Sequence, residues 1–323
     1  MTEAAAAAAP RAPRVTAIVI FLNEERFLAE AVESIAAQTF QDFELLLVDD
    51  GSTDGSAAIA RSFCAKQPSR FRYLTHGAGR PLGIAAARTL GLQHARADLI
   101  AFLDGDDVWT PEKLAEQVAI FDAEPAVQMV YGRTLIWHQW RDDAQAKDFF
   151  YELGMQPDRT IAPPQALRVM IENQAQTPTT CNAIVRRSVI DEVGGLVEAF
   201  PTMFEDQAFY AKIMARHPIY VSSRTWARYR QRSDSLTARI DLADELRTRE
   251  RFLRWLSAYL RGVGLRDPGV RAALRQELWA CRNRRLREQL RRLYRKLRRF
   301  LRPSVATAAL GQPTASDGAA GRG

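Results

Sequence analysis

The feature that most constrains this chain is a buried strand that ends in clustered carboxylates. Leu99–Leu103 is a run of five apolar residues, the pattern of a strand covered on both faces. Asp104, Asp106 and Asp107 follow within four residues, and Pro111 is placed to open a helix. A strand that leads through carboxylates into a helix predicts an α/β sheet with ligands at the carboxyl ends of its strands.

The three carboxylates have two interpretations. Carboxylates beside apolar side chains repel one another and lose hydration. A magnesium ion relieves that repulsion, since it takes one or two carboxylates and completes its shell with phosphate oxygens and water. The first interpretation is therefore a site for a metal and a diphosphate. The alternative, a polar turn with a helix N-cap, is the better one for an isolated D-x-D pattern, so the rest of the chain has to decide.

Two other buried strands also end in polar residues. The apolar run Val15–Leu22 precedes Asn23, which we expect to cap the following helix. The apolar run Phe43–Val48 precedes Asp49 and Asp50. Short connections between alternating strands and helices predict a parallel, doubly wound sheet. Carboxyl ends of parallel strands meet at one edge, so we expect these polar residues to lie beside the D-x-D carboxylates.

Apolar spacing, together with Gly and Pro, predicts the remaining elements. Helices are expected over residues 56–66, 82–95, 111–123, 163–172, 188–193 and 205–216, and strands over 71–74, 127–131, 180–186 and 219–229. Residues 133–160 mix aromatics with charges and have no clean period, so we expect a loop-rich insertion there. Composition divides the chain into a disordered leader over 1–13, an α/β domain over 14–238, a helical region over 239–302 and a disordered tail over 303–323.

The net charge of +7 is concentrated near the C-terminus. Residues 282–302 hold eleven Lys or Arg and one Glu, a net of +10, so the remainder carries about −3. Leucines recur there every three or four residues, which predicts a basic amphipathic helix. Such a helix suits either the interface of an anionic membrane or packing on protein. No recognised nucleic-acid reader motif accompanies the arginines, so nucleic acid is not an expected partner.

The cysteines and the hydropathy indicate a cytoplasmic protein. Three scattered cysteines match no metal-ligand spacing and suggest reduced thiols; they are Cys64, Cys181 and Cys281. No segment reaches the roughly 18 apolar residues of a membrane span, and residues 1–13 lack the basic and Leu-rich regions of a signal peptide. We expect a cytoplasmic protein that can associate peripherally with the inner face of the cell membrane through residues 282–302.

Six segments, in order, resemble a family-two glycosyltransferase with the GT-A fold, over roughly Arg14–Thr237. They are Val19–Glu24, Val48–Asp54, Gly83–Arg88, Phe102–Trp109, Phe204–Asp206 and Tyr229–Ser235. The resemblance implies an α/β, Rossmann-like sandwich with a mostly parallel central sheet, followed by C-terminal helices. The chain also departs from the family. Arg232 stands where a His is frequent, Thr89 replaces an Asn, and Pro81 and Leu82 replace polar residues before Gly83, which leaves Arg80 to substitute.

The resemblance implies transfer of a sugar, with inversion, to an acceptor hydroxyl, assisted by Mg²⁺ or Mn²⁺. Asp106 is the expected metal ligand, and Asp104 either binds ribose or reaches the metal through water. Asp206 is the expected base, with Glu205 orienting the acceptor or supporting the loop. Alternatively, both are acids favoured in a helix's first turn. Asp107 is expected to cap the helix that follows it.

The donor that the resemblance implies is a UDP-, GDP- or dTDP-linked sugar. Asp49 or Asp50 is expected at the base edge, unless both are turn residues. Arg230 and Arg232 are expected at the diphosphate, unless they are surface charges. The other implied donor-binding residues are Leu22, Asn23, Glu24, Arg80 and Arg88. The implied acceptor is a glycan or a lipid-linked molecule of polysaccharide or cell-envelope synthesis.

Two other functions use the same features. A non-catalytic nucleotide-sugar scaffold would keep the fold without turnover, and the departures at Arg232 and Pro81 favour it. Intact Asp104, Asp106 and Asp206 argue against it, because a scaffold needs no base opposite a metal site. A sugar nucleotidylyltransferase also holds metal with carboxylates. It usually has a Gly-rich basic loop after the first strand, where this chain has the acidic Asn23–Glu25.

Overall fold

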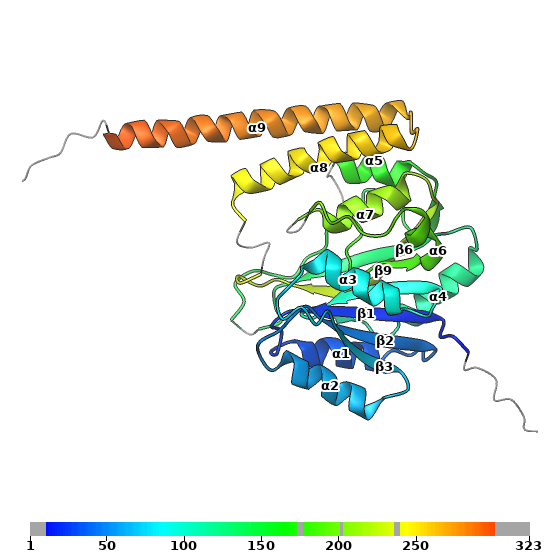
Figure 1. Cartoon of the computed structure of the whole chain (residues 1–323). Coiled ribbons are helices and arrows are strands. Elements are labelled where there is room, and N and C mark those ends of the chain that lie inside the picture. The colour runs from blue at the N-terminus through cyan, green and yellow to red at the C-terminus, as the bar shows by residue number, and fades with distance from the viewer. Residues whose placement is uncertain (1–10, 142, 173–176, 201–202, 236–239, 301–323) are drawn as a thin grey trace, which may run out of the picture.

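The structure is a computed structural model, and it describes residues 11–141, 143–172, 177–200, 203–235 and 240–300. These residues form helices around one nine-stranded sheet (Figure 1). The strand order is β3-β2-β1-β4-β8-β6-β9-β5, and β7 pairs with β9 outside this path. The α/β class that the sequence predicts is confirmed.

The first half of the sheet is parallel, as predicted. Its strands are β1 (Val15–Phe21), β2 (Phe43–Asp49), β3 (Phe71–Thr75) and β4 (Leu99–Asp104). Every residue of β1 and β2 is buried, because helices cover both faces of this half.

The second half of the sheet is mixed. β8 (Ile184–Arg186) pairs antiparallel with both β4 and β6 (Met129–Trp137), and β6 runs parallel to β9 (Ile219–Arg230). The short strands β5 (Val108–Trp109) and β7 (Arg159–Ile161) pair antiparallel with β9. The expectation of parallel strands therefore describes the first four strands and the β6–β9 pair, while the joining pairs are antiparallel.

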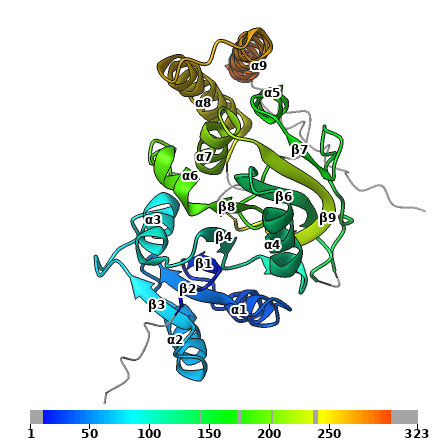
Figure 2. The same cartoon turned by 90° about the vertical axis from the view of Figure 1, so that its right-hand side faces the viewer.

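Helices cover the sheet in two layers (Figure 2). They are α1 (Leu28–Ala36), α2 (Ser56–Lys66), α3 (Ile84–His94), α4 (Lys113–Ala123), α5 (Gln165–Glu172), α6 (Arg187–Glu192), α7 (Glu205–Met214), α8 (Leu242–Gly262) and α9 (Pro268–Phe300). One core lies between the sheet and α1, α2 and α4. The other lies on the opposite face, under α3 and α5 to α9.

Three local predictions are wrong. The two ends of the loop expected over 133–160 form strands instead, the end of β6 and the start of β7. Both pair with β9, which is long enough to reach them. The strand expected over 180–186 shrinks to Ile184–Arg186, because the buried Asn182 side chain accepts from Gly132 N (2.7 Å) and donates to Arg133 O (2.7 Å). Asn23 does not cap α1, which begins at Leu28 without a side-chain cap.

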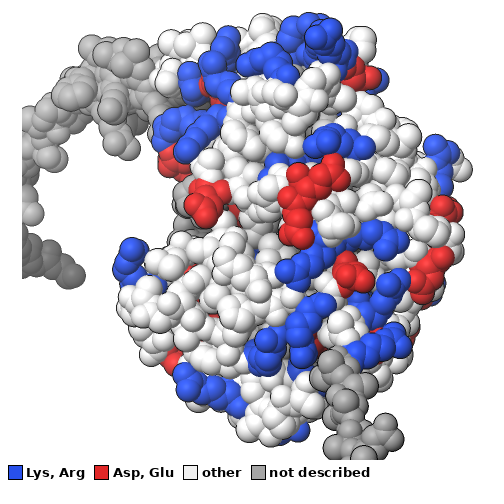
Figure 3. All heavy atoms as spheres, turned by 45° about the vertical axis from the view of Figure 1, so that its right-hand side comes forward, with Lys and Arg blue, Asp and Glu red and all other residues white. Residues whose placement is uncertain are grey.

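The C-terminal helices share the core of the α/β unit. Phe252, Leu256, Leu274 and Cys281 are buried together with residues of α5 and α7. The later part of α9 extends past the rest of the molecule, on the side where the carboxyl ends of the parallel strands lie (Figure 1). Figure 3 shows Lys and Arg gathered over α8 and α9 at the top of the molecule.

Some predictions fall outside the described residues. They include most of the leader over 1–13, the tail over 303–323 and the side chains of the basic segment beyond Leu290. The domain boundary near residue 238 stays a prediction. Within the described residues, no helix combines the length and the hydropathy that a membrane span requires.

Candidate active site

The predicted meeting of polar residues at one sheet edge is present. β1 lies between β2 and β4, with Phe21 opposite Asp49 and Ile20 opposite Asp104. Neighbouring strands lie about 4.8 Å apart, so Asp49 and Asp104 stand on either side of the end of β1. The three turns that follow these strands form the floor of the site.

Gly105 lets the D-x-D turn cross close to β1. Its N–H donates to Ile20 O at 3.0 Å. A Cβ at this position would lie 2.8 Å from the Cβ of Phe21, closer than two carbons can approach. The residue between Asp104 and Asp106 must therefore be glycine for this turn to form.

Asp106 faces Arg232, which stands where the family often carries His. One nitrogen of Arg232, Nη1, donates to Asp106 Oδ2 at 3.0 Å and to Glu24 Oε2 at 2.5 Å. The other donors of Arg232 bind Asp234 at 3.0 Å. Arg232 thus holds three acidic side chains together and joins the turn after β1 to the D-x-D turn.

The acidic side chains around Arg232 lie close together, and this changes their pKa values. Burial and the charge of Asp106 raise the pKa of Glu24 to about 7, although Arg232 opposes the shift. Burial and the charge of Asp104 raise the pKa of Asp106. Burial alone would lower the pKa of Arg232, but its bonds to Asp234 and Glu24 raise it. Burial and neighbouring acids therefore make the carboxyl groups of Glu24 and Asp106 hold their protons more tightly.

Arg88 bridges the D-x-D turn to α7. It is 3 % exposed, and it donates from Nη2 to Asp104 Oδ1 (2.7 Å) and from Nη1 to Glu205 Oε2 (2.5 Å). Burial disfavours its charge, but Glu205 and Asp104 raise its pKa. Arg88 thus forms a buried bridge that fixes Asp104 relative to the predicted base, and its contact with a donor stays a prediction.

Asp206 lies in the first turn of α7. Burial and the negative charge of Glu205 raise its pKa to about 6, while Arg88 opposes the shift. Phe204, just before α7, adopts a left-handed backbone with φ of 66°, a costly conformation for a bulky residue. Its ring stacks on Phe252 of α8, with centroids 5.2 Å apart, and this packing holds the start of α7 in place.

One predicted role and one alternative are corrected here, while contact of Arg230 with a diphosphate stays a prediction. Asp107 does not cap α4, whose N-cap is Glu112; its Oδ1 instead accepts from Arg230 N at 2.9 Å. Burial and the charges of Asp106 and Asp104 raise the pKa of Asp107 well above its usual range. Arg230 is not a surface charge either, because it is 4 % exposed and donates to Asp106 O (2.7 Å) and Glu30 Oε2 (2.6 Å). Arg230 supports the D-x-D turn from below.

Asp49 and Asp50 are both held by the protein, as the turn interpretation expects. Asp49 accepts from Gly51 N, Ser52 N and the Tyr73 hydroxyl at 2.7–3.1 Å. Asp50 accepts from the backbone N–H groups of Leu82 and Gly83 at 2.9 and 2.8 Å. Their contact with a nucleoside base stays a prediction.

The remaining donor-site candidates rim the same edge. Asn23 has φ of 58° and accepts from Thr53 N at 2.8 Å, so it ties the first turn to the second. Leu22 is 37 % exposed, and Arg80 is exposed on the loop that Asp50 fixes. These residues therefore stay candidates for contact with a bound donor.

Sequence reasoning missed the aromatic cage around the two arginines. Phe27, Trp137 and Trp140 place their ring centroids 4.4–5.2 Å from the guanidinium carbon of Arg230. Phe27 also lies 4.7 Å from that of Arg232. The sequence pattern indicates Phe27, which directly precedes α1, as a core residue. The two tryptophans lie in the aperiodic segment, where no pattern indicated their partners.

The carboxylate group fits a divalent cation that a ligand helps to hold. Within the described residues, no three His, Cys, Asp or Glu side chains form a ready metal cage. Asp104 and Asp106 nevertheless remain 31 % and 20 % exposed, and Asp107 Oδ2 is buried without a hydrogen-bond partner. Oxygen donors of this kind suit Mg²⁺ or Mn²⁺ once phosphate oxygens complete the shell.

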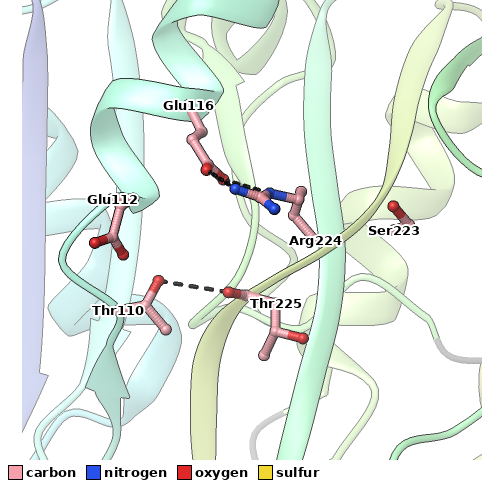
Figure 4. A pocket seen from close by; sticks show the side chains of 6 residues that line it. All are labelled: Thr110, Glu112, Glu116, Ser223, Arg224 and Thr225. Atoms are coloured by element: carbon pink, nitrogen blue, oxygen red, sulfur yellow. Dashed lines mark hydrogen bonds and ion pairs between the residues drawn. The ribbon is translucent and has the colours of Figure 1, made fainter.

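A separate hollow of about 430 Å³ lies between α4 and β9 (Figure 4). Its lining residues are Thr110, Glu112, Glu116, Ser223, Arg224 and Thr225. Arg224 forms an ion pair with Glu116 across it. Arg224 precedes Arg230 by six residues of β9, roughly 20 Å along a strand, so the hollow is not part of the carboxylate site.

Comparison with protein families gives a match over residues 16–194 to the model described as glycosyl transferase family 2. Among curated proteins, the chain is similar to the putative glycosyltransferase EpsE of Bacillus subtilis, with 37 % identity over 128 residues, 40 % of this chain and 45 % of that protein. An uncharacterised glycosyltransferase of a Nostoc species is 32 % identical over 123 residues, 38 % of this chain and 37 % of its own length. The chain thus matches less than half the length of these relatives.

Comparison with solved structures indicates the fold. Residues 1–349 of Staphylococcus aureus TarS, in complex with UDP-GlcNAc, superpose with a TM-score of 0.65 at 18 % identity, covering 82 % of this chain and 71 % of that one. A mannosyltransferase of Pyrobaculum calidifontis, in complex with GDP-Man and Mn²⁺, gives a TM-score of 0.54 at 19 % identity, covering 84 % and 70 %. The predicted GT-A fold is confirmed by these likenesses.

Proposed function

The chain belongs to glycosyl transferase family 2, and on that premise we propose that it is an inverting, metal-dependent glycosyltransferase. It moves a sugar from a nucleoside-diphosphate donor to an acceptor hydroxyl. Its acceptor is a glycan or a lipid-linked molecule of polysaccharide or cell-envelope synthesis. The complexes of similar structures with UDP-GlcNAc and with GDP-Man support a nucleotide-sugar donor.

One observation carries this proposal. Arg88 ties Asp104, at the end of β4, to Glu205, the neighbour of Asp206 at the start of α7. A donor-side carboxylate and a candidate base are thereby held in one buried frame. An inverting transfer needs this pairing, because the leaving diphosphate departs on one face of the sugar while the acceptor loses its proton on the other.

The chain's own residues supply the positioning in this proposal. Asp104 and Asp106 would hold Mg²⁺ or Mn²⁺, which when bound stabilises the negative charge of the departing diphosphate as a Lewis acid. Asp206 accepts the proton of the attacking hydroxyl at a carboxylate oxygen. Its pKa of about 6 leaves it ionised at neutral pH, yet more basic than an unperturbed Asp.

The test uses water as the acceptor. The full-length protein is incubated with Mn²⁺ and each of a panel of UDP-, GDP- and dTDP-sugars, and the anomeric configuration of the sugar first released is read by NMR. We expect release from one nucleotide class with inverted configuration, and loss of release in Asp206→Asn. Release with retained configuration, or no release from any donor that binds, would contradict the proposal.

We further propose that α9 associates with an anionic membrane surface. Among its described residues up to Leu290, the large apolar side chains that are exposed are Trp279 (70 %), Leu286 (54 %) and Leu290 (56 %), at spacings of seven and four residues. Arginines lie between and beyond them, and the helix extends on the side of the site. A cationic helix with one apolar stripe is the form that lies in a lipid interface. This arrangement would keep the protein on the inner face of the cell membrane.

A further inference from the structure

Three consecutive aromatic residues stand exposed beside the site. Phe149, Phe150 and Tyr151 are 40 %, 40 % and 53 % exposed. Among the described residues before 240, the only other exposed large apolar side chains are Leu22 and Leu82, which rim the donor side of the same sheet edge. Exposed apolar groups mark ligand contacts when they gather in one place. Their concentration here points to a ligand that continues beyond the donor.

The aromatic residues lie on a hairpin that hydrogen bonds and ring contacts hold in place. Phe149 exchanges both backbone hydrogen bonds with Ile136, at 2.9 and 3.3 Å. Asp148 Oδ1 accepts from the backbone N–H groups of His138 and Gln139, each at 2.8 Å. The His138 ring stacks on Phe149 with centroids 6.1 Å apart, and Tyr151 meets Phe149 edge-on at 5.1 Å. A surface held in this way needs little ordering when a ligand binds.

The hairpin is continuous with the candidate active site. Trp140 Nε1 donates to Gln231 O at 2.9 Å, directly before Arg232. The Trp140 ring meets Phe27 edge-on at 5.4 Å, beneath the two site arginines. Phe149 is three strand spacings from β5, the strand that directly follows the D-x-D turn, or about 14 Å. A single sugar cannot span that distance, but an oligosaccharide can.

The other end of the hairpin enters the core on the face of the sheet that α7 covers. Leu153, two residues beyond Tyr151, is 3 % exposed and belongs to the core cluster that contains Phe204. Phe204 directly precedes Glu205 and Asp206. The aromatic surface is thus joined on one side to the turn of Arg232 and on the other to the core that α7 covers.

The chemistry of the segment selects a glycan over a membrane. Between residues 138 and 152 the only aliphatic side chains are two alanines, and the charges are four acids against two bases, a net of −2. An acidic segment is repelled by anionic lipid. Aromatic faces bordered by polar groups instead pack against the C–H faces of uncharged sugar rings.

We propose that Phe149, Phe150 and Tyr151 form an acceptor platform that binds a neutral oligosaccharide and directs its end toward Asp206. The platform rests on the proposed glycosyltransferase function and specifies its acceptor as a neutral glycan several sugars long. It accounts for the aromatic residues of a segment whose sequence has no secondary-structure period.

The test compares glycan binding of three full-length proteins on an array of neutral oligosaccharides built from glucose, galactose, mannose and N-acetylglucosamine. The variant is Phe150→Ala/Tyr151→Ala, and the matched control is Trp279→Ala, which removes an exposed aromatic on α9. We expect the wild type and the control to bind a common set of glycans, and the double variant to bind it about 10-fold or more weakly. Equal binding by the double variant, or no glycan bound by the wild type, would overturn the platform.

Two further readouts separate this proposal from the function on which it rests. Donor hydrolysis with Mn²⁺ is expected to be unchanged in the double variant. If the wild type hydrolyses no donor but the double variant still loses glycan binding, the glycosyltransferase function fails and the binding surface stands. If the double variant loses vesicle flotation and keeps glycan binding, the surface faces a membrane and the platform is wrong.

Discussion

At the scale of single residues, the site is held together by ion pairs between turns that are distant in the sequence. Arg232 joins Glu24 and Asp106, and Arg88 joins Asp104 and Glu205. In a partly buried setting Arg88 compensates two carboxylates and Arg232 three with their forks of donors, which a lysine cannot reproduce. The positions of the acids therefore depend on the two arginines.

The pH dependence of turnover tests the role of Asp206. A base acts in its ionised form, so kcat/KM should fall as the pH decreases through its pKa of about 6. Glu205→Gln removes the negative charge that helps to raise this pKa, so the acidic limb should move to lower pH. We expect Asp206→Asn to reduce kcat by on the order of 100-fold or more while nucleotide binding persists. A limb near pH 4 in the wild type, or an active Asp206→Asn, would rule out this role.

The bridge at Arg88 predicts a large stability effect. Arg88→Met leaves Asp104 and Glu205 without their shared cation, and breaking a buried pair in this way costs about 3–5 kcal/mol. Urea unfolding measures the loss. Arg216→Met is the control, because its pair with Glu192 is 44 % exposed on both sides and should contribute about 1 kcal/mol or less. Similar losses in both variants would show that the Arg88 bridge adds nothing to stability.

At the scale of elements, the site depends on helices outside the parallel sheet. α8 packs its Phe252 under Phe204 and so holds the strained start of α7. β9 places Arg230 beneath the D-x-D turn and carries the chain to Arg232. The C-terminal helices thus support the start of α7, which holds the proposed base, as well as the core.

Phe252→Leu tests the support of α7. Both Phe252 and Phe121 are 1 % exposed, but Phe121 lies in the core on the other face of the sheet. Each Leu variant should lose about 1.5 kcal/mol or less in urea unfolding. Only Phe252→Leu should also lower kcat, with the KM for donor unchanged, because the start of α7 loosens. Equal kcat values for the two variants would show that α8 does not position the base.

Flotation with vesicles tests the membrane role of α9. A truncation before α9 would strip Val270, Leu274 and Cys281 from the core, so point substitutions are cleaner. We expect the full chain to float with phosphatidylglycerol vesicles at low salt and far less at 1 M salt, where charges are screened within about 3 Å. Leu286→Gln/Leu290→Gln should reduce flotation.

The matched control for this assay is Leu242→Gln, which alters an exposed leucine at the start of α8. It should float like the wild type. Unchanged flotation of the α9 double variant, or equal flotation with neutral phosphatidylcholine vesicles, would contradict the proposed membrane role.

At the scale of the whole molecule, the sequence predicts the half of the fold that is built from long buried apolar runs. Apolar runs such as Leu99–Leu103, joined by short helices, predict a parallel sheet. The antiparallel insertion of β8 between β4 and β6 could not be predicted, because β8 is only three residues long. The three residues of β8 form no sequence pattern that predicts which strands they pair with.

The same limit applies to the site. Turn chemistry and the matched segments identified the acids, and strand ends predicted that they would meet. These sequence features could not show which arginine pairs with which acid, because Arg88 and Arg232 reach their partners only through tertiary packing. Asp107 is an example: its sequence position suits a helix cap, but in the fold its carboxylate accepts a hydrogen bond from the backbone of Arg230 instead.

The measurement that tests the central claim most directly is calorimetric titration of the full-length protein with UDP, GDP and dTDP, each with and without Mn²⁺. Wild type, Asp106→Ala and the control Asp234→Ala are compared, since both acids contact Arg232. We predict that one nucleotide binds only with Mn²⁺, and that Asp106→Ala weakens this binding on the order of 100-fold or more while Asp234→Ala largely keeps it. Binding that is independent of Mn²⁺ and of Asp106, or no binding of any of the three nucleotides, would contradict a donor site at this edge of the sheet.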